Sequence, residues 1–399
     1  MKIAQVAPLI ESVPPRLYGG TERIVSYLTE ELVSLGHDVT LFASGDSITS
    51  AELSSCCIRS LRLDPKVRDT LPHFMLMIDK VFERAEEFDV IHFHIDLFHF
   101  PLFRSQAART LTTLHGRQDL EDLKPFYHRF GEMPLVSISG DQRKPLPHAN
   151  FVATIYHGIP VGLHRPSFEG GKYLAFLGRI SPEKRPDRAI RIARTAGIPL
   201  KIAAKIDKVD EDYFRKDILP LIDGPDVEFI GEINDLDKTK FLGEAGALLF
   251  PVDWPEPFGL AMIEAMACGT PVLAFRCGSV PEVIDDGATG KIVDSEEEAI
   301  AVLPEILSYD RRAVRQRFED RFTATRMAKD YVSTYRQSLK GRRSGGEMNG
   351  FRPRQLHLEG GDGPMPVSIK KPLPALFETA AGKPSRGKSG SSEIKIIAK

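Results

Sequence analysis

Two carboxylates, Glu256 and Glu264, stand eight positions apart around a loop that leads into an apolar helix. Pro255 and Pro257 exclude regular structure around the first carboxylate, whereas the second falls inside the predicted helix. Carboxylates accept hydrogen bonds from sugar hydroxyls, and the free N–H groups at the start of a helix suit a phosphate. Together these features favour a ligand with both hydroxyl and phosphate groups, such as a nucleotide-sugar.

The surrounding residues make this pattern more specific. Glu256 lies in the run Glu-Pro-Phe-Gly, and Glu264 opens the run Glu-Ala-Met-Ala-Cys-Gly-Thr-Pro-Val. The segment resembles the Glu-x7-Glu motif of retaining glycosyltransferases. Over roughly residues 1 to 340 the chain resembles family 4 of that class, which has the GT-B fold, an α/β architecture of two Rossmann-like doubly wound domains facing a central cleft.

The resemblance implies a role for each part of the motif. Glu256 would contact hydroxyls of the transferred sugar, Glu264 would contact the ribose, and the backbone amides of Phe258, Gly259 and Leu260 would meet the donor. The alternative is an exposed loop glutamate and a helix glutamate that caps a neighbouring turn.

A basic loop follows a predicted strand in the second half of the chain. Arg179 and Lys184, five positions apart, can clamp a diphosphate, the arginine through two hydrogen bonds and the lysine as a point charge. The alternative is a solvated basic turn that continues onto an exposed helix face. The spacing resembles the Gly-Arg-x4-Lys diphosphate motif of the family, which favours the first interpretation.

Three further positions are weaker candidates for the donor site. Lys205 is a candidate for the donor phosphates, and Ile230 and Gly231 end a strand that in relatives lies under the base.

Candidates in the first half of the chain lie at the ends of predicted strands. Gly19 and Gly20 permit a close backbone approach at a helix start, which also reads as ordinary capping, and the resemblance implies contact with the donor diphosphate and the acceptor. His115 ends a strand beside a glycine, where an imidazole can donate to a sugar hydroxyl near the reacting carbon. The alternative is a turn histidine without a role.

No metal and no cofactor are predicted. His92, His94 and His99 lack the cysteine, paired-glutamate or HExxH context that completes a metal site. The turn after the first strand contains no GxGxxG for a dinucleotide.

Strand-like and helical runs alternate through the first half, over 3–7, 22–35, 38–42, 66–88, 90–93 and 110–114, which is typical of a parallel doubly wound sheet. We expect an acceptor-side domain over 1–160, a linker over 161–171 and a nucleotide-sugar-binding domain over 172–320. A helix over 321–340 would cross back to the first domain, as in GT-B enzymes, and 341–399 would form a disordered basic tail.

Composition agrees with a two-domain enzyme: 399 residues are 42% hydrophobic with a formal charge of −2, which gives no reason to expect nucleic acid. Four cysteines form no disulfide framework, and no signal peptide or membrane span is evident, so we expect a cytoplasmic protein. The tail has eleven Lys or Arg against five Asp or Glu. It could touch anionic lipid at the inner face of the membrane, or it is a solvated appendage.

The resulting hypothesis is metal-independent, retaining transfer of a sugar from a nucleoside diphosphate to an acceptor hydroxyl, in polysaccharide, glycolipid or glycoconjugate synthesis. Two alternatives stay open, a sugar-nucleotide epimerase or hydrolase of the same fold and a non-catalytic nucleotide-sugar-binding protein. The sequence leaves open the sugar, the base and the acceptor, which could be a saccharide, a lipid-linked sugar or a small metabolite.

Overall fold

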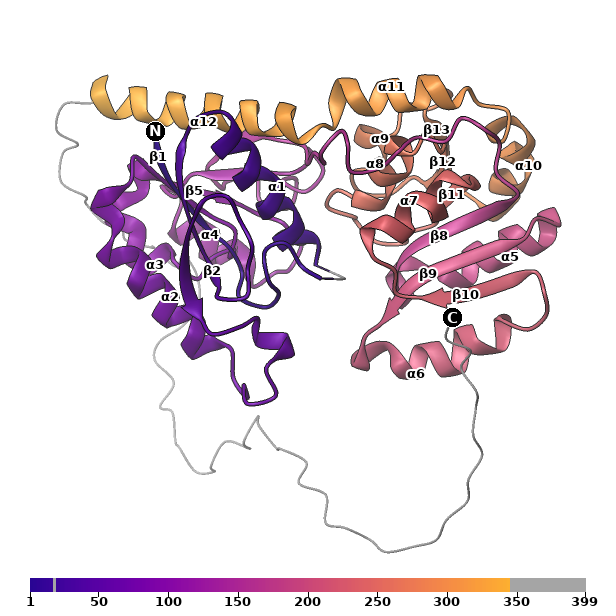
Figure 1. Ribbon diagram of the computed structural model, residues 1–399, viewed down its shortest axis with the longest axis horizontal. Helices are drawn as coiled ribbons and strands as arrows, with labels where there is room; N and C mark the ends of the chain where they lie inside the picture. Colours follow the sequence, from indigo (N-terminus) through magenta and orange to yellow (C-terminus); the bar gives the residue numbers. More distant parts are fainter. Residues whose placement is uncertain (17–18, 345–399) are drawn as a thin grey trace, which may run out of the picture. The chain divides into compact units, whose positions relative to one another are not determined.

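The computed structural model describes residues 1–16 and 19–344. Two parallel β-sheets organise the described chain, one in each half (Figure 1). The predicted basic tail over 341–399 lies outside the described residues from 345 onward, whereas residues 341–344 belong to the last helix and not to a disordered tail.

The first sheet has the strand order β3-β2-β1-β4-β5-β6-β7, and all its strand pairs are parallel. Its strands are β1 (Lys2–Val6), β2 (Asp38–Ser44), β3 (Glu52–Cys57), β4 (Val90–Phe93), β5 (Thr110–Thr113), β6 (Leu135–Ser137) and β7 (Phe151–Thr154). The order reverses between β1 and β4. In such sheets ligands bind outside the carboxyl ends of the strands at this switch point.

The second sheet has the order β10-β9-β8-β11-β12-β13 and is also parallel, with its switch point between β8 and β11. Its strands are β8 (Tyr173–Ile180), β9 (Leu200–Ile206), β10 (Val227–Gly231), β11 (Ala245–Phe250), β12 (Val272–Phe275) and β13 (Gly290–Val293). The predicted diphosphate loop follows β8, and the Glu-x7-Glu segment follows β11. Both therefore leave the sheet at its switch point.

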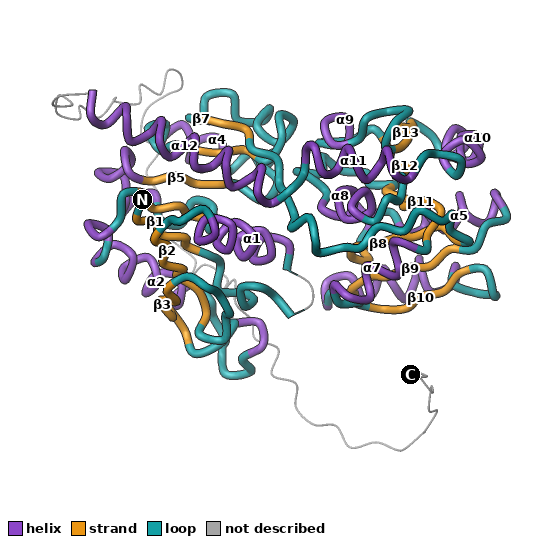
Figure 2. Tube along the Cα trace, turned by 45° about the horizontal axis from the view of Figure 1, so that its top comes forward, coloured by secondary structure: helices purple, strands orange, loops and turns teal. Residues whose placement is uncertain are grey.

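Helices connect the strands in both halves (Figure 2). In the first half they are α1 (Gly20–Ser34), α2 (Leu71–Glu83), α3 (Phe100–Phe103) and α4 (Leu123–Arg129). In the second half they are α5 (Pro186–Ala196), α6 (Glu211–Tyr213), α7 (Asp235–Gly243), α8 (Leu260–Ala267), α9 (Val280–Val283), α10 (Glu296–Ile306) and α11 (Arg311–Arg321). The last helix is α12 (Ala324–Ser344).

The predicted α/β fold with two doubly wound parallel sheets is confirmed, but two local predictions were wrong. Strand β3 was missed, because its sequence Glu-Leu-Ser-Ser-Cys-Cys has few of the branched apolar residues that indicate a strand. The helix predicted over 66–88 is shorter: α2 begins at Leu71 with Pro72 in its first turn, and a separate 3₁₀ turn covers Ala85–Glu87.

Helix α12 packs on the first half of the chain although it follows α11 directly in sequence (Figures 1 and 2). Tyr331 and Tyr335 are fully buried, and their hydroxyls reach Thr113 at 2.9 Å and His92 at 2.8 Å. A parallel bridge pairs Ile159 with Thr323 just before the helix. Side chains from the last helix of the described chain therefore pack against strands β4 and β5 of the first sheet.

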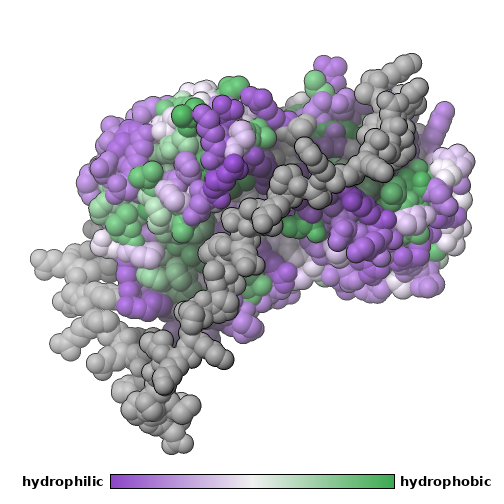
Figure 3. All heavy atoms as spheres, turned by 90° about the horizontal axis from the view of Figure 1, so that it is seen from below, coloured by the Kyte–Doolittle hydropathy of each residue, from purple (hydrophilic) through white to green (hydrophobic). Residues whose placement is uncertain are grey.

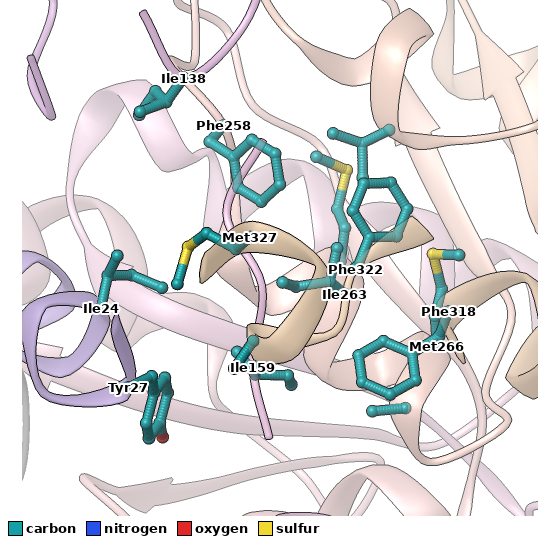
Figure 4. Packing of buried hydrophobic residues seen from close by; sticks show 14 of the residues in the cluster. Ile24, Tyr27, Ile138, Ile159, Phe258, Ile263, Met266, Phe318, Phe322 and Met327 are labelled. Carbon is teal, nitrogen blue, oxygen red and sulfur yellow. The ribbon is translucent and has the colours of Figure 1, made fainter. Parts of the chain in front are cut away.

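One buried cluster joins α1, α8, α11 and α12 (Figure 4). The Phe258 ring of the Glu-x7-Glu segment lies in it, with its centroid 6.1 Å from that of Phe322. At the surface, Figure 3 shows one face on which hydrophilic residues are interspersed with smaller hydrophobic groups. No helix in the described part of the chain is long and apolar enough to cross a membrane.

Candidate active site

The start of α8 is a tight, glycine-dependent turn. Gly259 has a φ of 82°, in the left-handed region that side chains disfavour. A Cβ at this position would lie 2.6 Å from Met262 Cε and 2.9 Å from the Phe250 ring. Only glycine therefore fits where the loop turns into the helix. The helix start has no side-chain cap.

Glu256 is held in this loop by two neighbours. It is 8% exposed, it accepts a hydrogen bond from Trp254 Nε1 at 2.8 Å, and it forms a close ion pair with Lys184. The Lys184 ammonium also lies 5.1 Å from the Trp254 ring centroid. Loop β11–α8 and the 3₁₀ turn Pro182–Lys184 after β8 thus meet at this carboxylate.

Glu264 lies inside α8 and is 4% exposed. Burial acts to raise its pKa, but Lys238 of α7, 2.8 Å away, and the nearby His164 and Arg23 together lower the pKa below its ordinary value. Lys238 also lies 3.4 Å from Asp235, which pairs with Arg23 of α1. The carboxylate is therefore ionised and neutralised by a partner from the adjacent helix.

The remaining cations are also paired with carboxylates. Arg179 contacts Glu183, lies 3.5 Å from Asp207 and lies 3.9 Å from Asp210. Lys205 lies 2.9 Å from Asp207. Burial acts to raise the pKa of Asp207, but hydrogen bonding and charge from Lys205 and charge from Arg179 leave the pKa lowered. If an anionic ligand bound to these cations, its oxygens would replace the protein carboxylates as their partners.

A cavity of about 460 Å³ brings these groups together. Both halves of the chain line it, and it contains most of the predicted site residues: Gly19, Gly20, His115, Arg179, Lys184, Lys205, Glu256, Phe258, Gly259, Leu260 and Glu264. Ile230 and Gly231 are not among the described lining residues. Ile230 is 37% exposed, and the cavity is instead lined by the next two residues, Glu232 and Ile233.

His115 belongs to a group of histidines at the carboxyl ends of β4 and β5. Its Nε2 lies 2.9 Å from His94 Nδ1, and its ring stacks on His157 with centroids 5.2 Å apart. Burial lowers the pKa of His115 to about 3 and lowers that of His94 well below its ordinary value. Both rings are therefore neutral at physiological pH.

Sequence reasoning missed several residues of this site. Lys238 was not predicted, because nothing in its local sequence indicates that α7 lies against α8. Arg23 and Trp254 also line the cavity, the first one turn into α1 and the second two residues before Glu256. Their proximity to predicted residues was the available signal.

The described residues contain no group of three or more His, Cys, Asp or Glu side chains arranged to hold a metal ion. His92 and His94 are both buried, with ring centroids 4.1 Å apart, whereas His99 stacks on Phe93. His99 also hydrogen-bonds Thr112 at 3.0 Å. The rings are thus engaged with the protein interior.

Two family models match the chain. "Glycosyltransferase Family 4" matches residues 18–156, and "Glycosyl transferases group 1" matches residues 164–321. The second model covers the loops after β8 and β11, and the first covers the helix start at Gly20 and His115.

Curated relatives are similar over part of their length. A D-inositol 3-phosphate glycosyltransferase of Mycobacterium bovis is 30% identical over 195 residues, which cover 46% of this chain and 40% of the relative. An uncharacterised 41.2 kDa protein from the cps region of Klebsiella pneumoniae is 29% identical over 171 residues, covering 41% and 46%. The chain spans less than half the length of these relatives.

Solved structures with the same architecture are more distant in sequence. Sucrose-phosphate synthase from Thermosynechococcus elongatus aligns with a TM-score of 0.67 at 20% identity, covering 86% of this chain and all of the other. AviGT4, a glycosyltransferase involved in avilamycin A biosynthesis, aligns with a TM-score of 0.65 at 22% identity, covering 86% and 98%. Fold and family models agree, and the chain therefore belongs to the group 1 glycosyltransferases, family 4, with the GT-B fold.

Proposed function

We propose that this protein transfers a sugar from a nucleoside diphosphate to an acceptor hydroxyl, with retention at the anomeric carbon and without a metal ion. The observation that carries the proposal is the arrangement of Glu256 and Glu264 in one cavity with Arg179, Lys184 and the start of α8. Carboxylates suit the hydroxyls of a sugar and a ribose, and the cations and helix amides suit a diphosphate.

Similar proteins support a nucleotide-sugar donor. Anabaena Alr3699/HepE has been solved in complex with UDP and glucose, and it aligns with a TM-score of 0.64 at 16% identity. The same protein has been solved with UDP-glucose. The acceptor would be a saccharide, a lipid-linked sugar or a small metabolite.

The reaction replaces one bond at the anomeric carbon with another and moves one proton. The bond between the anomeric carbon and the diphosphate oxygen breaks, and the acceptor oxygen forms the new bond on the same face of the sugar. The acceptor proton passes to an oxygen of the leaving diphosphate. Arg179, Lys184 and the amide of Leu260 would stabilise the charge that develops on this leaving group, the task for which preorganised donors are most effective.

Lys184 and Glu256 form a pair whose role changes when donor binds. Both side chains are largely buried, at 17% and 10% exposure, and the ammonium of Lys184 is the direct charged partner of the Glu256 carboxylate. A diphosphate beside Lys184 would share its charge and release the Glu256 oxygens for sugar hydroxyls. Lys184 would therefore pair with Glu256 when no donor is bound and with the diphosphate when donor is bound.

The first experiment follows the fluorescence of Trp254, the only tryptophan. Because its indole donates to Glu256 at 2.8 Å, sugar binding at that carboxylate should change its emission. Purified protein in EDTA is titrated with UDP-, GDP- and ADP-sugars. Saturation with one base identifies the donor, and turnover of that donor with acceptor in EDTA supports metal independence. No binding by fluorescence or calorimetry would overturn the proposal.

Products separate the proposal from its alternatives. A transferase needs an acceptor to release nucleoside diphosphate at full rate, whereas an epimerase or hydrolase forms product from donor alone. A binding protein would saturate and turn nothing over. Cytoplasmic location and contact of the basic tail with anionic lipid stay predictions.

Lys184→Ala tests the leaving-group assignment. Loss of one preorganised donor lowers the rate by ~10²–10³. Lys216→Ala, in an exposed pair with Asp212, is the matched control and should keep its rate. Near-full turnover by a folded Lys184→Ala protein would refute the assignment.

A further inference from the structure

A chain of buried hydrogen bonds leads from α12 to His115. His115 Nε2 lies 2.9 Å from His94 Nδ1, and His94 Nε2 lies 2.8 Å from Gln5 Oε1. The Gln5 amide nitrogen donates to the Tyr335 hydroxyl at 3.2 Å. Strand β1, the loops after β4 and β5, and the last helix each contribute one member.

The chemistry of each atom fixes the direction of these bonds. The carbonyl oxygen of Gln5 can only accept, so the proton of His94 is on Nε2. A neutral His94 then has a bare Nδ1, which can only accept. His115 must therefore donate from Nε2, and its own Nδ1 is left without a proton.

The far end of the chain is consistent with the same direction. The Tyr335 hydroxyl accepts from Gln5 and donates to His92 Nδ1 at 2.8 Å. His92 Nε2 then carries a proton and donates to Thr113 Oγ1 at 2.7 Å. The Gln5 amide nitrogen also lies 3.5 Å from His92 Nδ1, which is an acceptor in this arrangement, so the orientation of the Gln5 amide is consistent with its contacts at both ends.

We propose that Gln5, His94 and Tyr335 are positioning residues that hold neutral His115 as the Nε2–H tautomer, so that its Nδ1 accepts a hydrogen bond from a substrate hydroxyl. The identity of that hydroxyl rests on the proposed transferase function, but the tautomer does not. His115 lines the cavity and is partly exposed. This proposal differs from the sequence-based expectation that His115 donates to a sugar hydroxyl.

Burial reinforces this arrangement. His92 and His94 are 0% and 3% exposed, and Tyr335 is fully buried. Burial lowers the pKa of both histidines well below their ordinary value and raises that of Tyr335. This chain of hydrogen bonds therefore contains neutral groups, and reversing its direction requires the Gln5 amide to rotate and each histidine to move its proton to its other ring nitrogen. At Nδ1 of His115 the site therefore favours a substrate hydroxyl, which can donate a hydrogen bond, over a substrate group that can only accept one.

The direct test measures the tautomer in the unliganded full-length protein. Long-range ¹H–¹⁵N NMR with ring-labelled histidine distinguishes a protonated from a bare ring nitrogen by chemical shift, and His115→Asn assigns the His115 signals. We expect a protonated Nε2 and a bare Nδ1 at His115. A protonated Nδ1 in the wild type overturns the proposal, and this result does not depend on activity or on the stability of a variant.

Two substitutions at Gln5 test the positioning role. Gln5→Leu removes the acceptor of His94, and both rings should then show shifts averaged between tautomers. Gln5→Glu keeps an acceptor oxygen toward His94, so the wild-type shifts should return. His99→Gln is the control, because this buried histidine hydrogen-bonds Thr112 outside the chain and its loss should leave the His115 shifts unchanged.

Activity provides a separate readout. With Gln5→Leu we expect kcat for transfer to fall about tenfold, the effect of one lost hydrogen bond, with KM for the donor unchanged. Gln5→Glu should restore kcat. If the Gln5→Leu protein shows averaged shifts but an unchanged kcat, the proposed role of the His115 tautomer in transfer is refuted. If the wild-type protein shows the predicted tautomer but has no transferase activity, the proposed function is refuted. The assignment of the proton to His115 Nε2 would still hold.

Discussion

Glu264 depends on Lys238, and replacing this lysine by methionine should destabilise the second half of the chain. The substitution keeps the length of the side chain and removes its charge. The side chains of the pair are only 13% and 5% exposed, and their charged atoms are 2.8 Å apart. In Lys238→Met the carboxylate would stay buried, with only the weaker influence of His164 and Arg23 to offset its desolvation.

Removing one partner of a buried pair costs about 3–5 kcal/mol. This penalty should depend on pH. In the wild type the folded-state pKa of Glu264 is lowered from its ordinary value of 4.5. The pair therefore stabilises the fold above that value, and this contribution is lost as pH falls through the folded pKa. In the variant, burial dominates and raises the pKa, so Glu264 takes up a proton as pH falls and its penalty decreases.

The assay is urea denaturation followed by Trp254, which lies in the same half of the chain as Glu264 and reports its unfolding. Measurements at about pH 7.5 and about pH 5 should show a large difference between Lys238→Met and wild type that decreases at the lower pH. Lys238→Arg, which keeps the charge, is the conservative control. Lys216→Met, in an exposed pair, should change little.

Two results would refute this reasoning. The first is a Lys238→Met protein as stable as wild type at neutral pH. The second is a penalty that does not decrease on acidification, which would indicate lost packing instead of an unpaired carboxylate.

Three further changes test other parts of the structure. Gly259→Ala should lose more stability in thermal unfolding than Gly287→Ala: both have φ near 80°, which costs about 1–2 kcal/mol with a side chain, but only Gly259 also faces a steric clash. Arg311→Met should cost at least ~3 kcal/mol in urea, because this buried guanidinium donates to three carbonyls and Thr270. Glu282→Gln should cost ~1–3 kcal/mol, since the carboxylate accepts from two backbone N–H groups of the loop after β6. Equal losses for the two glycine variants, or wild-type denaturation by either of the other proteins, would contradict these assignments.

Sequence reasoning predicted what is encoded locally. The turn at Gly259 and the buried helix that follows depend on neighbouring residues, so motif and periodicity were sufficient to place Glu256 and Glu264. Alternation of strands and helices also predicted the first parallel sheet, and the family resemblance implied the second. Strand β3 was missed because its pairing with β2, and not its composition, makes it a strand.

Contacts between distant residues could not be predicted in this way. Lys238 reaches Glu264 from another helix, and Gln5 reaches Tyr335 across 330 positions. These contacts determine which carboxylate is neutralised and which nitrogen of His115 is bare. The sequence therefore indicated the side chains at the site better than their protonation states.

Because α12 supplies Tyr331 and Tyr335 to the first sheet, synthesis on the ribosome has a fixed order of events. Residues 1–160 emerge first, but His92 and Thr113 gain their tyrosine partners only after Tyr335 has left the exit tunnel. The second sheet can fold as a nascent unit before the first is complete. A nonsense codon just before Ala324 would thus remove α12 and the residues after it and leave the earliest-made half of the protein unfinished.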